Sequence, residues 1–225
     1  MDGSAKKGNY QAVVSENTQI RGRYFRLELE FTGEGAEAFA MVEPGQFAEF
    51  DVSGAALPPV EVIPEDLREK CRRRVLLRRP FSFCGIKRRQ GRTLVEVLYA
   101  VVGPSTVRMC GLSSGDTISV IGPLGRGFAM PEGKELAVLL SGGMGAPPIQ
   151  HLAQEIASRY RDVEIMMFAG AKSVDDLPFA VESHKEGPIE FPELGIEIFI
   201  ATDDGSAGYG GMVTQCFSQW LEKAE

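Results

Sequence analysis

The chain has 225 residues, of which 44% are hydrophobic and 24% charged, and its formal net charge is −7. This length suits one large domain or two small ones, and the negative charge argues against a nucleic-acid partner, because phosphate binding needs a positive field. Since no apolar run is long enough for a membrane span and the N-terminus has no export signal, neither a membrane partner nor secretion is expected.

Four cysteines, at positions 71, 84, 110 and 216, are dispersed and include no Cys-x-x-Cys pair. Their spacing indicates neither a zinc site nor an iron–sulfur cluster, so no metal ligands are assigned. Dispersed thiols without an export signal are typical of a reducing compartment, which predicts a cytoplasmic protein.

The first part of the chain has the two-residue periodicity of β-strands. Apolar and polar residues alternate most clearly over residues 24–30, and further strands are predicted at residues 46–52, 93–102 and 117–121. Several short strands separated by glycine and proline predict an antiparallel β-barrel or sandwich.

A loop-like excursion at residues 53–77 interrupts these strands, and residues 65–74 within it are expected to form a short charged helix. Three arginines at positions 72–74 are followed by Arg78 and Arg79. Such a run is either a solvated face or a contact for phosphate or an acidic partner, and the sequence leaves both open.

From residue 134 onward, strand and helix patterns alternate. Strands are predicted at residues 136–140, 163–169 and 196–201, the first of them as a strand buried on both faces. The helix after the first strand carries its apolar residues at Ile149, Leu152, Ala153, Ile156 and Tyr160, and the last helix carries them at Val213, Cys216, Phe217, Trp220 and Leu221. Three parallel strands with crossover helices form half of a doubly wound, Rossmann-like sheet.

The predicted fold is therefore an N-terminal antiparallel β-barrel at residues 8–131, followed by a partial Rossmann-like parallel sheet with helices at residues 132–225. The boundary is placed near residues 131–133, where proline and glycine separate the two periodicities.

Residues 141–148 form a glycine turn, Ser-Gly-Gly-Met-Gly-Ala-Pro-Pro, between the first strand of the second domain and its helix. Gly142, Gly143 and Gly145, around Met144, would let a dinucleotide pyrophosphate approach the backbone and the helix N-terminus. Pro147 and Pro148 fit the first helical turn, although Pro148 stands where the usual motif has its third glycine. On pattern alone, the turn is either a nucleotide site or a tight structural turn.

A second loop, Thr202-Asp203-Asp204-Gly205-Ser206, follows the third strand of this domain. It is either an ordinary Asp-Gly turn or a second wall of the same pocket, because loops at the carboxyl ends of parallel strands share one edge of the sheet.

Arg79-Pro80-Phe81-Ser82 combines a guanidinium that can clamp a diphosphate, an aromatic ring that can pack on a ring system, and a hydroxyl that can bond a ring nitrogen. Considered alone, the motif is better explained as the entry to an edge strand.

After the strand at residues 93–102, Gly103-Pro104-Ser105-Thr106 resembles the start of a short helix with a polar cap, whose N–H groups could hold the same diphosphate or simply begin a helix.

Taken together, the motifs resemble the ferredoxin–NADP reductase superfamily and, more narrowly, the electron-transfer subunits of type B dihydroorotate dehydrogenases. The matching segments lie at residues 44–47, 78–82, 122–128, 142–147, 170–173 and 202–208. The resemblance covers most of the chain and rests, for the narrower family, on the Thr-Asp-Asp-Gly-Ser run and the doubled arginine before proline.

The resemblance implies an FAD-binding barrel and a pyridine-nucleotide domain that moves a hydride between NAD(H) and FAD. It also implies a dihydroorotate dehydrogenase catalytic subunit as partner in pyrimidine biosynthesis. Arg79 would hold the FAD diphosphate, Phe81 and Ser82 would contact the isoalloxazine, and Gly103, Ser105 and Thr106 would continue the site. Residues 142–147 and 202–205 would face NADH, which is favoured over NADPH.

No catalytic residue is expected beyond those that position the cofactors, because the cofactor carries the chemistry. The two histidines, His151 and His184, are expected on a helix surface and in a loop.

Three departures from the family pattern matter. Ser105 stands where the family usually has glycine, and the excursion at residues 53–77 is unusually long. The family also continues into a further strand and a cysteine-rich segment that holds a [2Fe–2S] cluster, whereas this sequence stops at Glu225. We expect a truncated second domain that lacks one strand of its sheet, with a naturally cluster-free variant as the alternative.

Two other functions stay open from the sequence. One is a stand-alone flavin or ferredoxin reductase, or a subunit of a sulfide- or hydrogenase-type complex. The other is a non-catalytic nucleotide-binding assembly module that has lost its flavin. Flavin absorbance and the identity of copurifying partners would distinguish them.

Overall fold

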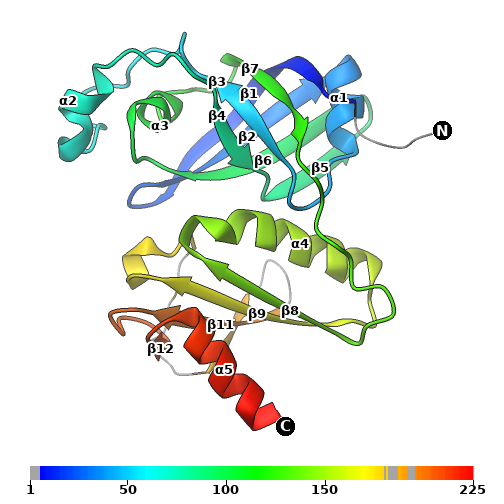
Figure 1. Ribbon diagram of the computed structural model, residues 1–225. Coiled ribbons are helices and arrows are strands. Elements are labelled where there is room, and N and C mark those ends of the chain that lie inside the picture. Colours follow the sequence, from blue (N-terminus) through cyan, green and yellow to red (C-terminus); the bar gives the residue numbers. More distant parts are fainter. Residues whose placement is uncertain (1–5, 180, 182–186, 192–195, 225) are drawn as a thin grey trace. The chain divides into compact units, whose positions relative to one another are not determined.

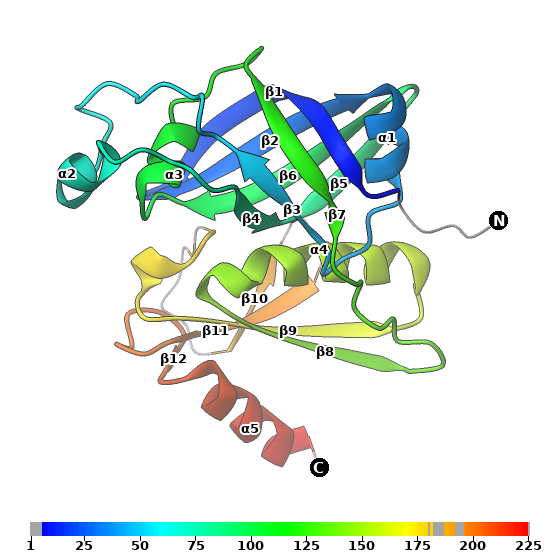
Figure 2. The same ribbon diagram turned by 45° about the horizontal axis from the view of Figure 1, so that its top comes forward.

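A computed structural model describes residues 6–179, 181, 187–191 and 196–224 of the chain (Figures 1 and 2). The chain forms two compact units, one ending at Gly127 and one beginning at Phe128. Each unit has its own hydrophobic core.

The N-terminal unit is built on a seven-stranded sheet with the strand order β4-β3-β7-β1-β2-β6-β5, and every pair in it is antiparallel. Its strands are β1 (Gly8–Arg21), β2 (Tyr24–Thr32), β3 (Phe47–Asp51), β4 (Arg79–Ser82), β5 (Gly85–Arg89), β6 (Arg92–Ala100) and β7 (Thr117–Leu124). Between β4 and β5, the Cys84 N–H donates to the Glu96 carbonyl on β6 at 2.9 Å, so the curved sheet closes toward its own other end. The predicted antiparallel β domain is confirmed.

Alternation along the strands makes the core of this unit. Leu27, Leu29 and Phe31 of β2 point inward and are fully buried, while the residues between them are partly exposed. Helix α1 (Gly33–Ala40) covers one end of the sheet, where the ring of Phe39 stacks on Phe31 with 3.9 Å between centroids.

The excursion between β3 and β4 carries the 3₁₀ turn η1 (Glu65–Leu67) and the helix α2 (Arg68–Cys71), which is shorter than the predicted helix. Buried apolar side chains attach it to the core: Ile63, Leu67, Cys71 and Val75. The three arginines at positions 72–74 are exposed, as a solvated face would be.

The C-terminal unit contains a sheet with the order β10-β11-β9-β8, with β12 paired to β11. Its strands are β8 (Leu136–Gly142), β9 (Glu164–Ala171), β10 (Pro188–Phe191), β11 (Ile196–Thr202) and β12 (Tyr209–Gly210). The predicted parallel strands β8, β9 and β11 are confirmed, whereas antiparallel β10 and short β12 were not predicted.

Helices cover both faces of this sheet, as a doubly wound fold requires. Helix α4 (Ala146–Arg159) packs Leu152, Ala153 and Ile156 against one face. Helix α5 (Val213–Ala224) packs Phe217 and Trp220 around Phe168 on the other. Two 3₁₀ turns, η2 (Gly143–Gly145) and η3 (Val174–Asp176), follow β8 and β9.

Three expectations for this unit differ from the structure. Burial alternates along β8, which pairs only with β9 among the described strands, so it is not buried evenly on both faces. His151 is buried and not on the helix surface, because it lies one turn after buried Pro147 and joins the packed stripe of α4. Leu221 of α5 is exposed. His184 lies outside the described residues.

None of the helices within the described ranges has the length and apolar character that a membrane-spanning helix needs.

Candidate functional site

The Arg79-Pro80-Phe81-Ser82 motif forms strand β4, which lies at one end of the strand order. It pairs with β3 in antiparallel register, with Phe50 opposite Arg79 and Phe47 opposite Ser82. Arg79 and Pro80 are exposed, and Phe81 and Ser82 are half-buried. The motif is thus an edge strand whose arginine remains at the surface.

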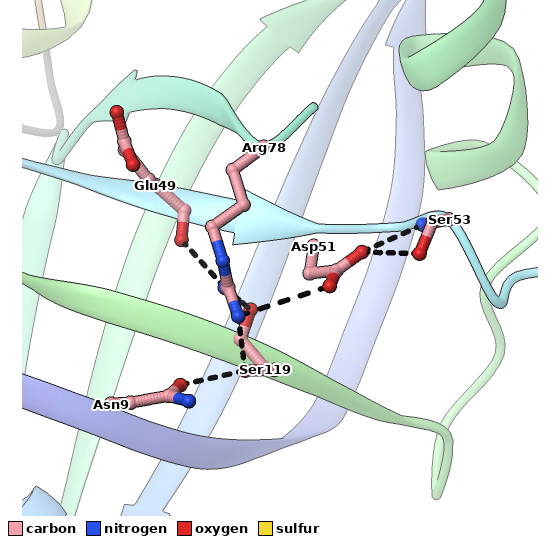
Figure 3. Close-up of polar contacts among 6 residues, drawn as sticks. All are labelled: Asn9, Glu49, Asp51, Ser53, Arg78 and Ser119. Atoms are coloured by element: carbon pink, nitrogen blue, oxygen red, sulfur yellow. Dashed lines mark hydrogen bonds and ion pairs between the residues drawn. The ribbon is translucent and has the colours of Figure 1, made fainter. Parts of the chain in front are cut away.

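The preceding residue, Arg78, has the opposite environment (Figure 3). Its guanidinium donates to the Ser119 carbonyl at 2.9 Å and to Ser119 Oγ at 2.8 Å, and it lies 3.8 Å from the Asp51 carboxylate. Ser119 Oγ in turn donates to Asn9 Oδ1 at 2.7 Å. Arg78 therefore fastens the start of β4 across β3 and β7 to β1.

Asp51 is held in an ionised state that suits this contact. The hydroxyl and backbone N–H of Ser53 both donate to Asp51 Oδ1, and these hydrogen bonds, with a smaller contribution from the Arg78 charge, lower the pKa of the Asp51 carboxyl. The carboxylate is therefore available to Arg78 throughout the neutral range.

The loop at Gly103 is the other segment of the predicted FAD site, and it follows a strand that contacts β4. The Phe81 ring meets the Tyr99 ring edge-on with 6.3 Å between centroids, and Tyr99 is the penultimate residue of β6. The chain passes from β6 directly to Gly103 and helix α3 (Pro104–Met109). The Phe81 contact therefore places β4 beside the end of β6, from which the chain leads to the Gly103 loop.

Within this loop, the predicted residues have different roles. Thr106 Oγ1 accepts hydrogen bonds from the N–H groups of Val102 and Gly103 at 2.9 and 3.1 Å, so this hydroxyl closes the loop. Ser105 and Thr106 are buried, whereas Gly103 faces open space where a side chain would begin. Val102, which sequence reasoning did not select, is 67% exposed and presents an apolar surface beside the loop.

The glycine turn of the C-terminal unit leads from β8 through η2 into α4. A Cβ at Gly142, Gly143 or Gly145 would meet no atom within 4 Å, so the backbone there borders open space. Gly143 also has a φ of +49°, a conformation that glycine adopts without strain. Met144 is exposed, while Pro147 is buried in the first turn of α4. The turn has the open backbone that a diphosphate needs.

The Thr202–Gly205 loop is tightly built. Thr202 is fully buried, and its hydroxyl donates to the Ala207 carbonyl and accepts from the Ala207 N–H at 2.8 and 2.9 Å. Asp203, Asp204 and Gly205 are exposed. Hydrogen bonds from the hydroxyl and N–H of Ser206 lower the pKa of Asp204, so the loop presents an ionised carboxylate at neutral pH.

Strand register aligns these loops. Gly142 pairs with Gly170, and Ala171 pairs with Thr202, so β8, β9 and β11 end at the same edge of the sheet. The Asp203 N–H also donates to the Ala171 carbonyl at 3.0 Å. The glycine turn and the acidic loop therefore line one edge of the C-terminal unit, which is where parallel sheets bind ligands.

The described residues do not fit an iron–sulfur cluster. Within these ranges, no three His, Cys, Asp or Glu side chains lie together as a metal site would need. Cys71, Cys84 and Cys216 are buried and Cys110 is half-buried, and none of these four cysteines forms a disulfide. Burial raises the pKa of the Cys84 thiol to about 12, so Cys84 stays protonated and is a poor metal ligand.

No protein-family model matches the chain. The chain is 36% identical over 215 residues to a dihydroorotate dehydrogenase B (NAD(+)) electron transfer subunit from Geobacillus thermodenitrificans, covering 94% of this chain and 70% of that protein. A subunit of the same name from Fusobacterium nucleatum is 30% identical over 204 residues, covering 90% of this chain and 66% of that protein.

Solved structures show the same fold. The NADH-dependent reduced ferredoxin–NADP oxidoreductase superposes with a TM-score of 0.64 at 23% identity, covering 98% of this chain and 65% of that chain. Phthalate dioxygenase reductase superposes with a TM-score of 0.57 at 15% identity, covering 97% of this chain and 57% of that chain.

The fold and the sequence relatives define a ferredoxin-reductase-like oxidoreductase of the NAD(P)H- and FAD-dependent class. The sequence identity narrows this class: the chain belongs to the family of dihydroorotate dehydrogenase B electron transfer subunits, and its role is electron transfer. It spans about 70% of the length of the first of these relatives.

Proposed function

We propose that the chain moves a hydride from NADH to FAD and exchanges electrons with a dihydroorotate dehydrogenase catalytic subunit. One observation carries the proposal. In a member of this family, Arg79 is exposed on β4, and β4 contacts the end of β6 through Phe81 and Tyr99. The chain then continues from β6 to Gly103, where the backbone borders open space. An arginine fork beside an open glycine backbone is suited to a dinucleotide diphosphate.

FAD fits the surface of the N-terminal unit. Arg79 would hold the diphosphate together with the backbone at Gly103, where a side chain would occupy the open space. Phe81 and Ser82, both half-buried, would face the isoalloxazine, and the exposed Val102 offers an apolar contact beside them. Ser105 and Thr106 would act by shaping the loop, because their side chains are buried.

NADH fits the carboxyl edge of the C-terminal sheet. The open backbone at Gly142, Gly143 and Gly145 would hold its diphosphate at the start of α4. Asp203 and Asp204 are exposed on the neighbouring loop, and the lowered pKa of Asp204 keeps that carboxylate charged. Negative charge at this edge disfavours the 2′-phosphate of NADPH, so NADH is the proposed substrate.

When bound, FAD supplies the chemistry that accepts a hydride and releases electrons to a partner. The chain's residues would bind and orient FAD. Arg79 would neutralise the charge of its diphosphate, Phe81 would limit the position of the isoalloxazine ring, and Ser82 would offer that ring a hydroxyl. No step is assigned to an iron–sulfur cluster, since the described residues do not fit one.

The proposal is tested by purifying the chain with added FAD, removing unbound flavin, and recording the visible spectrum. We expect retained flavin absorbance that is bleached anaerobically by NADH faster than by NADPH, and copurification with a dihydroorotate dehydrogenase catalytic subunit. Absence of FAD binding would overturn the proposal in favour of a nucleotide-binding module. Flavin reduction without that partner would instead indicate a stand-alone reductase.

Replacing Gly143 with alanine is expected to weaken NADH binding by about tenfold, because the new methyl group enters the space proposed for the diphosphate. Gly133→Ala is the matched control. Gly133 also has a positive φ, +67°, and an added Cβ there would meet open space. It precedes β8, however, whereas Gly143 follows it, so Gly133 lies at the opposite end of the strand from the glycine turn. The NADH concentration dependence of flavin reduction measures the effect. Equal losses in the two variants would show that backbone strain alone is responsible.

A further inference from the structure

Asn17 of β1 makes three hydrogen bonds that connect distant parts of the N-terminal unit. Its Nδ2 donates to the Met109 carbonyl at 2.8 Å and to the Leu112 carbonyl at 3.0 Å. Its Oδ1 accepts from the Tyr99 hydroxyl at 3.0 Å. Both N–H groups and the oxygen of this amide are therefore used.

The two carbonyls belong to the end of helix α3. Met109 is the last residue of α3, and Leu112 lies in the turn that follows, where its N–H donates back to the Met109 carbonyl. A helix of one and a half turns has few internal hydrogen bonds, so its position depends on the contacts at its ends. Asn17 supplies such a contact from the sheet, whereas Arg108 ties α3 to the Ala55 carbonyl in the excursion.

The third partner, Tyr99, leads to the other half of the proposed FAD site. Tyr99 is buried, its ring stacks on Phe25 with centroids 5.6 Å apart, and it meets Phe81 edge-on. Burial raises the pKa of Tyr99 well above its ordinary value, so the hydroxyl remains a donor to Asn17 at any physiological pH.

We propose that Asn17 is a positioning residue for the FAD site, which holds the Gly103 loop, through α3, in a fixed place relative to Phe81 on β4. Thr106 closes the loop at the start of α3, and Asn17 fixes the helix at its end. Tyr99 connects Asn17 to β4, because its hydroxyl donates to Asn17 and its ring contacts Phe81. This inference rests on the proposed function, since FAD is the ligand whose site is positioned.

Asn17→Asp is the sharpest test, because it preserves shape and the contact with Tyr99 but places a carboxylate against two carbonyls. Asn17→Ala removes all three bonds, and Tyr99→Phe removes only the hydroxyl while keeping the ring against Phe81. Gln19→Ala is the matched control, because Gln19 is also an amide on β1 but donates to the Gly22 carbonyl in the β1–β2 turn.

For each full-length variant, FAD affinity is measured by fluorescence titration, the flavin environment by visible circular dichroism, and apoprotein stability by urea denaturation. We expect both Asn17 variants to bind FAD about tenfold more weakly, equivalent to about 1.4 kcal/mol, with an altered flavin dichroism. Tyr99→Phe should lose less, and adding it to Asn17→Ala should cost less than the sum of the two single changes. Gln19→Ala should retain the wild-type affinity and dichroism.

If folded Asn17 variants keep the wild-type FAD affinity and dichroism, the role of Asn17 is overturned, while the proposed function stands. A loss of affinity without any change in dichroism, in proportion to the loss of apoprotein stability, would also overturn it, since that pattern indicates a purely structural residue. If the Asn17 variants do not fold, wild-type flavin dichroism and affinity in Tyr99→Phe would overturn it. A wild-type chain that binds no FAD would overturn the proposed function, and this inference with it.

Discussion

Replacing Arg79 with alanine is expected to weaken FAD binding by about 10- to 100-fold, because a charge-assisted contact to a diphosphate contributes roughly 1.5–3 kcal/mol. The stability of the apoprotein should change little, since Arg79 is exposed on the edge strand β4. Fluorescence titration with FAD and urea denaturation of the apoprotein measure the two quantities separately.

Arg73→Ala is the control for this prediction. Arg73 is an exposed arginine in the excursion that precedes β4, so its removal changes the net charge equally without altering β4 itself. If Arg73→Ala weakens FAD binding as much as Arg79→Ala, long-range charge and not a direct clamp would explain the effect, and the assignment of Arg79 would be wrong.

Unlike Arg79→Ala, Arg78→Ala is expected to destabilise the apoprotein, lowering its free energy of unfolding by about 2–3 kcal/mol. The change removes the hydrogen bonds to the carbonyl and hydroxyl of Ser119 and leaves Asp51 without its ion pair. Urea denaturation with Arg79→Ala as the neighbouring comparison measures the effect. Equal stabilities of the two variants would contradict the stabilising role of the Arg78 contacts with Ser119 and Asp51.

Acid should reduce the cost of Arg78→Ala. The pKa of Asp51 is lowered in the folded protein, so the stabilisation that its carboxylate contributes is present above its unfolded pKa and is lost as pH falls through the folded pKa. The difference in unfolding free energy between wild type and Arg78→Ala should therefore shrink at strongly acidic pH. A difference that is independent of pH would show that the Asp51 carboxylate does not contribute to the stabilisation by Arg78.

Residues 24–30, 93–102 and 136–140 reveal their strands because alternating or continuous apolar side chains leave a local pattern. Strand β1 escaped prediction because it carries few buried residues along its length, chiefly Ala12 and Val14. Short β10 and β12 likewise have too few residues for a period to show. The pairing of β1 with β7 joins residues that are far apart in the sequence, such as Gly8 and Gly122, so it leaves no local pattern.

Some features of the candidate site could likewise be predicted from local sequence, and others could not. Glycines and an arginine at short spacing predict a phosphate-binding backbone, and the structure places open space at Gly103 and Gly143. Local pattern does not separate Arg78 from Arg79, because their opposite roles depend on Ser119, which is distant in sequence. Nor does it show that Asn17 reaches the carbonyl of Met109, 92 residues away in the sequence. Those contacts depend on tertiary packing.

The pairing of β1 with β7 has a consequence for the order of events during synthesis. Gly8 pairs with Gly122 and Val13 with Thr117, so the first strand of this unit is completed by the last strand of the same unit. Contacts between such distant residues form slowly, since a long loop must close first. Because Arg78 bonds Ser119 on β7 and Asn17 lies on β1, the site proposed for FAD should take shape in the nascent chain only after β7 has emerged.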